Sequence, residues 1–230
     1  EDVPLKDPKA FRLIGKVAPR VDARAKATGK AQFTADFTLP GMLTAVVAHP
    51  PRFGATVKSF DAAAAKAVPG VKDVVQIPTG VAVLAEGFWA ARQGREKLTV
   101  EWDESKAFRG SSADLFIQYR ALAGKPGLVA RKEGNAEAAL RRGKAVEAVY
   151  EFPYLSHASM EPLNCIVRLS NDKCEIWNGE QMQTPDQIAV AALTGLKPEQ
   201  VSLTMLFAGG SFGRRANPKA DYVLEAVSIA

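Results

Sequence analysis

The segment of this chain best suited to contact a ligand is a glycine-rich loop made of Gly209, Gly210, Ser211, Phe212, Gly213, Arg214 and Arg215. Glycines let the backbone approach a bound group closely, and successive N–H groups in such a loop can donate to oxygen or phosphate. The loop lacks the Lys-Ser/Thr ending of a P-loop and the Gly-x-Gly-x-x-Gly spacing of dinucleotide sites. Taken alone it is best interpreted as a tight turn, although Arg214 and Arg215 would suit a phosphate-bearing ligand.

Gln181 is a second candidate, because it stands between a predicted strand and a predicted helix. Thr184 and Pro185 suit the N-cap and first turn of that helix. An amide side chain at such a junction can donate to a bound oxygen. A single glutamine is more often a polar surface residue, so the residue type alone leaves both interpretations open.

His157 and Glu161 are four residues apart, which would place them on one face of a helix as ligands or as an acid/base pair. Pro162 biases Glu161 towards an extended conformation and argues against that helix. We therefore expect Glu161 to order its loop through hydrogen bonds. His49, before Pro50, is interpreted as a strand-end residue. The sequence shows no Ser/His/Asp arrangement, carboxylate pair or metal-binding cluster.

The two cysteines, Cys165 and Cys174, have neither zinc nor iron–sulfur spacing. They flank a predicted hairpin whose turn lies at Asn171 and Asp172. A tight turn would pair Leu169 with Cys174 and leave Cys165 out of register, whereas a longer loop would bring the sulfurs into bonding range. A disulfide is left open.

Alternating short strands and helices must position these residues. In the first half we expect a helix capped by Asp61, a second helix over residues 88–97, and strands at 31–36, 42–48, 56–60, 71–77, 81–85 and 98–102. A helix from Ser111 or Ser112 to Gly124 follows, and the turn residues at 124–127 mark a domain boundary. The second half is expected to contain the hairpin, strands at 146–154 and 201–207, and helices at 135–142, 185–193 and 221–230.

The composition, with 47% hydrophobic and 24% charged residues, is that of a globular chain rather than a disordered one. The net charge is +5, but the basic residues are scattered, so nucleic acid is not an expected partner. No apolar run approaches the ~18 residues of a membrane span. The chain begins without Met or a signal peptide and ends in a helical pattern without a stop signal, which predicts a fragment of a longer protein.

Several motifs together resemble the large, molybdopterin-binding subunit of the xanthine dehydrogenase/aldehyde oxidase family, in particular the branch of the isoquinoline 1-oxidoreductase beta subunits. The first half resembles the family's hammerhead domain through the motifs at residues 14–16, 20–22, 26–31, 39–43 and 68–71. The second half resembles the opening of the molybdopterin-binding region through His157, Met160-Glu161-Pro162, Asn164, Gln181 and the loop at 209–213, in that order. Ser211 and Arg214-Arg215, where many relatives have Gly and Gly-Lys, match this branch.

The resemblance implies an α+β fold in three parts. Residues 1–25 form a leading segment, residues 26–127 a hammerhead-like α/β domain, and residues 128–230 the N-terminal part of an incomplete molybdopterin-binding domain.

The resemblance also implies a cofactor site made of Gln181, Gly209, Gly210, Ser211, Phe212, Gly213 and Arg214. Gln181 matches the glutamine that hydrogen-bonds an oxo ligand of molybdenum, and the amides of Phe212 and Gly213 match those near the metal centre and pterin. The dithiolene of the cofactor supplies the metal ligands, so no protein metal ligand is expected. The family's catalytic glutamate lies near the end of the full subunit. No catalytic residue is expected here, since Glu161 belongs to another motif and Glu225 is interpreted as structural.

The implied activity is that of a molybdenum-dependent oxidoreductase, which hydroxylates an aldehyde or N-heteroaromatic carbon with oxygen from water. The implied cofactor is molybdopterin in its cytosine dinucleotide form. Electrons would pass to iron–sulfur clusters on a small partner subunit, and a cytochrome acceptor and a periplasmic or exported location are typical of the branch. The fragment alone is expected to be inactive.

Two other classes of function stay open at this point. In the first, the chain is a non-catalytic module whose hammerhead-like half docks a partner subunit, and the glycine loop is only a turn. In the second, the loop binds a nucleotide or phosphate by itself, which the absent P-loop lysine disfavours. Cofactor retention by the full-length subunit separates the enzyme from the docking module.

An incomplete domain leaves apolar faces exposed, and such faces drive self-association. We therefore predict that the isolated chain associates with itself as its concentration rises. Sedimentation velocity over a concentration series would show a sedimentation coefficient that increases with concentration, whereas a monomer throughout the series would contradict the prediction.

Overall fold

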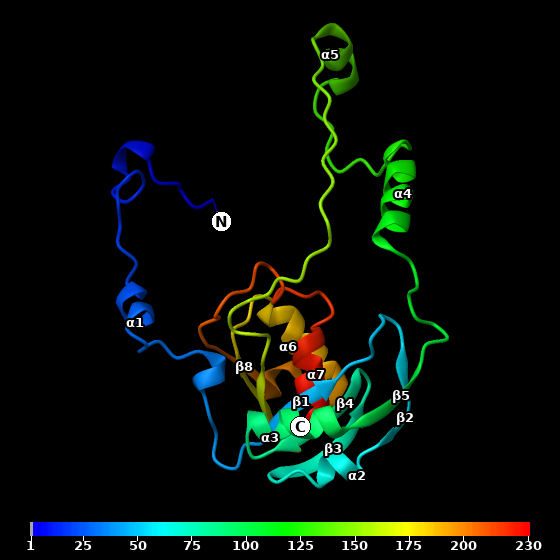
Figure 1. The fold of residues 1–230 in the computed structure, drawn as a ribbon. Helices are drawn as coiled ribbons and strands as arrows, with labels where there is room; N and C mark the ends of the chain where they lie inside the picture. Colours follow the sequence, from blue (N-terminus) through cyan, green and yellow to red (C-terminus); the bar gives the residue numbers. More distant parts are fainter. Residues whose placement is uncertain (1) are drawn as a thin grey trace. The chain divides into compact units, whose positions relative to one another are not determined.

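The computed structural model describes residues 2–230. Contacts between residues divide it into two compact units, one formed by Leu43–Ala158 and the other by the described residues up to Met42 together with Ser159–Ala230. Both units mix helices and strands, which confirms the predicted α+β class (Figure 1). The units do not coincide with the expected segments 1–25, 26–127 and 128–230, and those boundaries stay a prediction.

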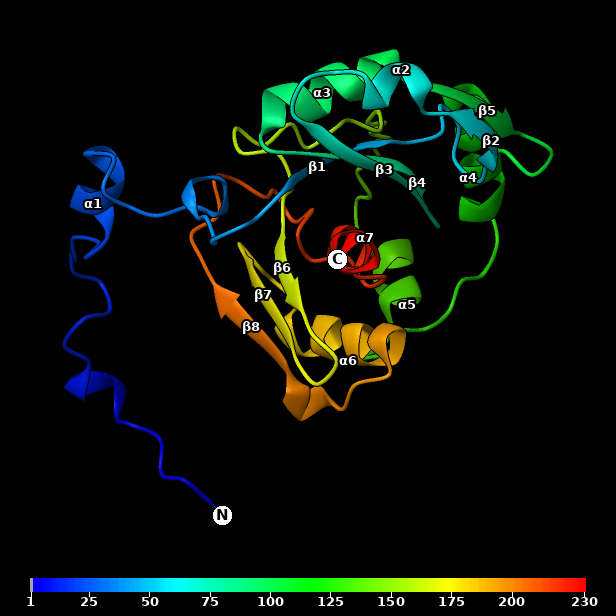
Figure 2. The ribbon, with the colours of Figure 1, turned by 90° about the horizontal axis from the view of Figure 1, so that it is seen from below.

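The packed elements of Leu43–Ala158 are β1 (Thr44–Ala48), β2 (Thr56–Asp61), α2 (Ala63–Lys66), β3 (Val71–Ile77), β4 (Gly80–Ala85), α3 (Phe88–Lys97) and β5 (Thr99–Asp103). Antiparallel strands in the order β1-β4-β3 form one sheet, and β2 pairs with β5 in a second. Helices α2 and α3 lie against the first sheet (Figure 2). These elements follow the predicted ranges to within one or two residues.

Strand β4 is the centre of this unit because β1 and β3 flank it on both sides. Val81 and Val83 are fully buried and pack with Ala65 of α2 and Val74 of β3. A central strand that is buried on both faces needs apolar side chains along nearly its whole length, which explains the run of small and branched residues in β4.

Two further helices, α4 (Ser112–Ala123) and α5 (Ala136–Arg142), bury none of their residues and extend away from the sheets of their unit (Figure 1). Helix α4 begins at one of the two predicted caps, since Ser111 Oγ accepts the N–H of Asp114. Helix α5 is capped by Asn135, whose Oδ1 accepts the N–H of Ala138. The expected strand at 146–154 is wrong, because among the described residues this segment pairs with no other strand.

The elements of the second unit are η1 (Pro8–Ala10), α1 (Ala23–Ala27), η2 (Thr34–Asp36), β6 (Ile166–Leu169), β7 (Cys174–Asn178), α6 (Gln183–Thr194), η3 (Pro198–Gln200), β8 (Val201–Met205) and α7 (Asp221–Ile229). The sheet has the order β6-β7-β8, with β6 antiparallel and β8 parallel to β7. Helix α6 is the crossover that parallel pairing requires. Ile176, Val190, Val201 and Val223 form the centre of the core beneath it.

The hairpin between β6 and β7 adopts the tight-turn alternative. Leu169 lies opposite Cys174, and both Cys165 and Cys174 are free thiols. Burial raises the pKa of both thiols, so these cysteines are inert members of the core rather than reactive groups.

The expected strand at 31–36 is also wrong. Asp36 accepts the N–H of Phe33 at 3.1 Å, and this local bond closes the η2 turn in place of a strand ladder. Only Phe33 keeps a strand-like pairing, through an isolated bridge to Phe207.

No helix within residues 2–230 combines the length and apolar character needed to cross a bilayer.

Gly94 of α3 faces the sheet at close range. A Cβ at this position would lie 2.8 Å from Val83 Cγ1 and 2.9 Å from Val71 Cγ2. We predict that Gly94→Ala lowers the free energy of unfolding by about 1–3 kcal/mol despite the better helix propensity of alanine, because the methyl group overpacks the core.

The matched control is Gly124→Ala at the end of α4, where the nearest atom to a Cβ is 3.8 Å away. Urea unfolding should place this variant within about 0.5 kcal/mol of the wild type. Equal stability of the two variants would show that α3 does not approach the sheet this closely.

Candidate functional site

The glycine loop connects β8 to α7 and holds an unusual backbone. Gly210, Phe212 and Gly213 have φ values of 112°, 53° and 89°. The left-handed region costs a bulky residue such as Phe212 on the order of 1–3 kcal/mol, so such a conformation persists only where the surroundings impose it.

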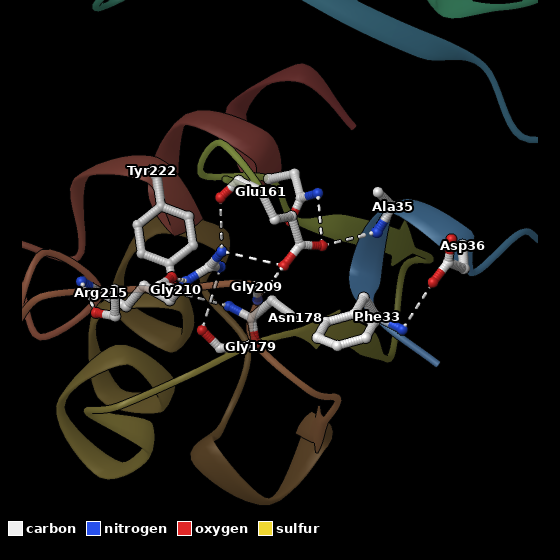
Figure 3. Close-up of polar contacts among 12 residues, drawn as sticks. Phe33, Ala35, Asp36, Glu161, Asn178, Gly179, Gly209, Gly210, Arg215 and Tyr222 are labelled. Atoms are coloured by element: carbon white, nitrogen blue, oxygen red, sulfur yellow. Dashed lines mark hydrogen bonds and ion pairs between the residues drawn. The ribbon is translucent and has the colours of Figure 1, made fainter. Parts of the chain in front are cut away.

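Arg215 anchors the base of this loop, and its guanidinium is fully buried. Nε donates to the carbonyl of Gly210 at 3.0 Å, and Nη1 donates to the carbonyl of Gly179 at 3.3 Å. Nη2 donates to the carbonyl and the carboxylate of Glu161, both at 3.3 Å (Figure 3). Arg215 therefore joins the glycine loop to the end of β7 and to the segment before β6, and it cannot serve the phosphate-bearing ligand that its position in the sequence suggested.

Glu161 is the largely buried partner of Arg215, with a side chain that is 10% exposed, and it accepts hydrogen bonds from donors in three segments. Its Oε2 accepts the N–H of Gly209 at 2.7 Å, and its Oε1 accepts from Ala35 N at 3.0 Å and Asn164 Nδ2 at 3.2 Å (Figure 3). Burial alone would raise the pKa of Glu161, but these bonds and Arg215 outweigh it and lower the pKa. The predicted role of Glu161 in ordering the loop is confirmed.

Gly209 must be glycine because the loop passes directly over Glu161. A Cβ at Gly209 would lie 2.4 Å from Glu161 Cβ, far inside the contact distance of two carbons that are not bonded to each other. The glycines were predicted to let the backbone approach a bound ligand closely. At Gly209 the backbone instead approaches Glu161 of the protein itself.

Gln181 lies beside the loop and is held by Ser211. Ser211 Oγ accepts the N–H of Arg215 at 3.1 Å and donates its own hydrogen to Gln181 Oε1. Because the amide oxygen is engaged in this way, the Nε2 group of Gln181 remains as a donor. The exposed glutamine is thus an oriented amide rather than a mobile surface residue.

The tip of the loop offers further donors. Among residues 2–230 no protein acceptor lies opposite the N–H groups of Phe212 and Gly213. A Cβ at Gly213 would meet nothing within 4 Å, and the Phe212 side chain is 76% exposed. Two free backbone donors and an oriented amide fit a cofactor rich in oxygen acceptors.

Arg214, the last of the predicted cofactor residues, points elsewhere in this structure. Its Nη1 and Nη2 donate to the two carboxylate oxygens of Asp221 at 3.0 and 2.7 Å. This bidentate pair ties the loop to the first residue of α7. A contact between Arg214 and a cofactor stays a prediction.

The remaining candidates are not brought together. His157 is exposed, and residues 157–161 are not helical, as Pro162 led us to expect. β1 ends at Ala48, which agrees with a strand-end position for His49. The described residues contain no group of three or more His, Cys, Asp or Glu side chains that could hold a metal ion.

Sequence reasoning missed a buried polar cluster next to Gln181. Asn178, Glu180 and Asp186 are each at most 5% exposed, and Asn178 Nδ2 donates to Glu180 Oε2 at 2.7 Å and contacts Tyr222 Oη at 3.2 Å. A signal was present, because Asn178 and Glu180 continue the inward-facing alternation of Cys174 and Ile176 along β7.

The fold and these donors define an α+β domain with a preorganised loop, a class of protein suited to hold an oxygen-rich cofactor. The profile of the molybdopterin cofactor-binding domain matches residues 123–229, a range that contains Gln181 and the whole loop.

Relatives extend the match over nearly the whole chain. The beta subunit of isoquinoline 1-oxidoreductase from Brevundimonas diminuta is 32% identical over 95% of this chain, and a nicotinate dehydrogenase subunit from Pseudomonas putida is 29% identical over 100% of it. The chain spans 29% and 20% of the length of these two relatives.

Solved structures agree in fold. Quinoline 2-oxidoreductase from Pseudomonas putida 86 superposes with a TM-score of 0.66 and 20% identity over 91% of this chain and 32% of its own. Aldehyde oxidoreductase from Desulfovibrio gigas gives a TM-score of 0.64 and 20% identity over 92% of this chain and 29% of its own. The resemblance to the xanthine dehydrogenase/aldehyde oxidase family that the motifs predicted is confirmed, since residues 123–229 match the molybdopterin cofactor-binding domain and the chain is similar to subunits of molybdenum hydroxylases.

The buried pair of Glu161 and Arg215 can be tested by Glu161→Gln. The glutamine keeps the shape but removes the charge opposite a buried guanidinium and turns an NH2 group towards a donor. We expect the free energy of unfolding at neutral pH to fall by about 3 kcal/mol or more. Because the pKa of Glu161 is lowered in the fold, the wild type should lose this advantage as pH falls through that pKa.

Glu175→Gln is the matched control, since Glu175 pairs with Arg168 and Lys173, whose side chains are more than half exposed. Denaturant unfolding should show a cost of at most about 1 kcal/mol there. Equal costs for the two glutamates would contradict the buried-pair interpretation.

Proposed function

We propose that this chain is part of the large subunit of a molybdenum hydroxylase and that Gln181 and the loop at 209–213 hold its molybdopterin cofactor. The observation that carries the proposal is the amide of Gln181, oriented by Ser211 beside the free N–H groups of Phe212 and Gly213. Donors fixed before a ligand arrives bind it at a lower entropic cost.

Each residue has a defined part in this proposal. Gln181 would donate its Nε2 hydrogen towards the molybdenum centre, and the amides of Phe212 and Gly213 would donate to the metal centre and the pterin. Glu161 and Arg215 do not touch the cofactor in this account, because they hold the loop in place. Arg214 would reach the cofactor only by leaving Asp221.

When bound, the cofactor would supply the oxidation of an aldehyde or N-heteroaromatic carbon with oxygen from water. The names of the relatives that act on isoquinoline and nicotinate support this substrate class. We place the general base outside the 230 residues, since neither Glu161 nor Glu225 occupies a suitable position: Glu161 is engaged by Arg215, and Glu225 lies within α7.

The proposed complex has further parts. We infer that the cofactor is the cytosine dinucleotide form and that a small subunit with iron–sulfur clusters receives the electrons, with a cytochrome as the acceptor beyond it. The names of both relatives, which designate them as subunits, support the presence of a partner subunit.

A second candidate function is docking of a partner without catalysis. The segment that includes α4 and α5 favours it, because its apolar side chains are exposed, among them Ile117, Leu122, Leu128, Val129 and Leu140. A segment with this many exposed apolar side chains is typical of an interaction surface.

Cofactor content separates the two candidates. We predict that the full-length subunit, co-expressed with its small partner, retains about one molybdenum and one pterin per chain. Gly213→Val should abolish retention, because valine cannot adopt a φ of 89° without strain and covers the free amides. Gln181→Ala should lose turnover with a smaller loss of cofactor.

Gly195→Val is the matched control for this experiment. Gly195 ends α6 with a φ of 75° and open space around its Cβ position, so it carries the same backbone strain away from the loop. It should retain the cofactor. A metal-free and inactive wild type would favour the docking function.

A further inference from the structure

Two carboxyl groups, Glu180 and Asp186, are buried together at the N-terminus of α6, with exposed fractions of 5% and 1%. The two groups are close enough for the charge of Glu180 to raise the pKa of Asp186, whose oxygens are both buried and have no hydrogen-bond partner among the described residues. Buried carboxyl groups are rare without compensating partners, so the hydrogen bonds of each oxygen indicate its protonation state.

Glu180 has the surroundings of a carboxylate. Its Oε1 accepts the N–H groups of Gln181 at 2.9 Å and Met182 at 3.1 Å. Its Oε2 accepts from Asn178 Nδ2 at 2.7 Å and Tyr222 Oη at 3.5 Å (Figure 3 shows Asn178 and Tyr222). Glu180 therefore holds the turn that leads into α6, and its negative charge suits the nearby helix N-terminus. The N-cap predicted at Thr184 is wrong, because α6 begins at Gln183 after Met182, which makes no side-chain cap bond.

Asp186, unlike Glu180, accepts no hydrogen bonds. Within the described chain neither of its carboxylate oxygens receives a hydrogen bond from a donor. The titratable and charged groups around the pair are Cys165, Arg215, Asp221 and Tyr222. Arg215 is the only cation among them, and it is engaged by Glu161 and by backbone carbonyls. It therefore does not compensate a negative charge on Asp186.

We propose that Glu180 and Asp186 share one proton, carried on Asp186 and donated to Glu180, and that this pair positions Gln181. Glu180 fixes the backbone N–H of Gln181, while Ser211 fixes its side-chain oxygen. Loss of the proton would place two negative charges side by side and loosen the turn that Glu180 holds before α6. The proposal of a shared proton does not depend on the proposed function. Only its consequence for cofactor binding rests on that function.

The pH dependence follows from the direction of the shift. Burial, followed by the neighbouring Glu180, raises the pKa of Asp186 from its ordinary 3.8 to about 7. The folded chain then keeps a proton that the unfolded chain has already lost between about pH 4 and pH 7, so stability falls as pH rises through this window. Asp186→Asn removes the titration and supplies a permanent N–H donor to Glu180.

The first experiment follows the proton in the full chain by infrared spectroscopy and by urea unfolding. At about pH 5.5 the wild type should show the C=O stretching band of a buried protonated carboxyl group, which Asp186→Asn lacks and the exposed control Asp172→Asn retains. The urea midpoint of the wild type should fall towards pH 7, and that of Asp186→Asn should fall less. An unchanged band in Asp186→Asn, or parallel pH profiles, would overturn the proposal.

The second experiment reads the positioning of Gln181 by amide hydrogen exchange. After correction for intrinsic exchange, protection of the Gln181 and Met182 amides should drop about tenfold or more in the wild type between about pH 5.5 and pH 8. It should stay constant in Asp186→Asn. Equal behaviour of the two proteins would refute the positioning role, and because no cofactor is needed, a failure of the proposed function would leave this result unaffected.

Discussion

The buried ion pair between Arg215 and Glu161 is the interaction on which the site depends. The two side chains together bind the carbonyls of Gly179 and Gly210, the N–H groups of Ala35 and Gly209, and the amide of Asn164. These groups come from four segments that are far apart in the sequence. Breaking a buried pair of this kind costs about 3–5 kcal/mol, a large part of the stability of a typical domain.

This constraint explains why the loop can keep a strained backbone. Phe212 stays in the left-handed region, and the tip of the loop presents its N–H groups outward instead of folding them back onto the protein. On the other side of the site, Ser211 and Glu180 hold Gln181 at its side chain and its backbone. The donors are therefore in place before any ligand arrives, and the protein carries the strain.

Much of the fold could be predicted from local sequence patterns. Helix α3 over Phe88–Lys97 and strand β3 over Val71–Ile77 have the predicted bounds, and the turn after Leu169 set the register of the hairpin. The failures at 31–36 and 146–154 share a cause, because a strand requires a neighbouring strand that local alternation cannot supply.

Less of the candidate site could be predicted from the sequence. The motifs predicted Gln181 and the glycine loop as the cofactor residues, which stays a prediction, and the proline at 162 predicted the structural role of Glu161. The burial of Arg215 depends on contacts with distant segments, so the sequence suggested a phosphate-bearing ligand for this residue, and it did not single out Glu180 or Asp186. The burial of these side chains depends on long-range packing, which local sequence patterns do not predict.

The central claim is that the oriented amide of Gln181 and the loop amides form the cofactor site. The most direct test is a crystal structure of the full-length subunit with its cofactor bound. We expect Gln181 Nε2 and the N–H groups of Phe212 and Gly213 to lie within hydrogen-bonding distance of cofactor atoms, with Ser211 still bonded to Gln181. A cofactor bound elsewhere, or loop amides satisfied by the protein's own carbonyls, would contradict the account.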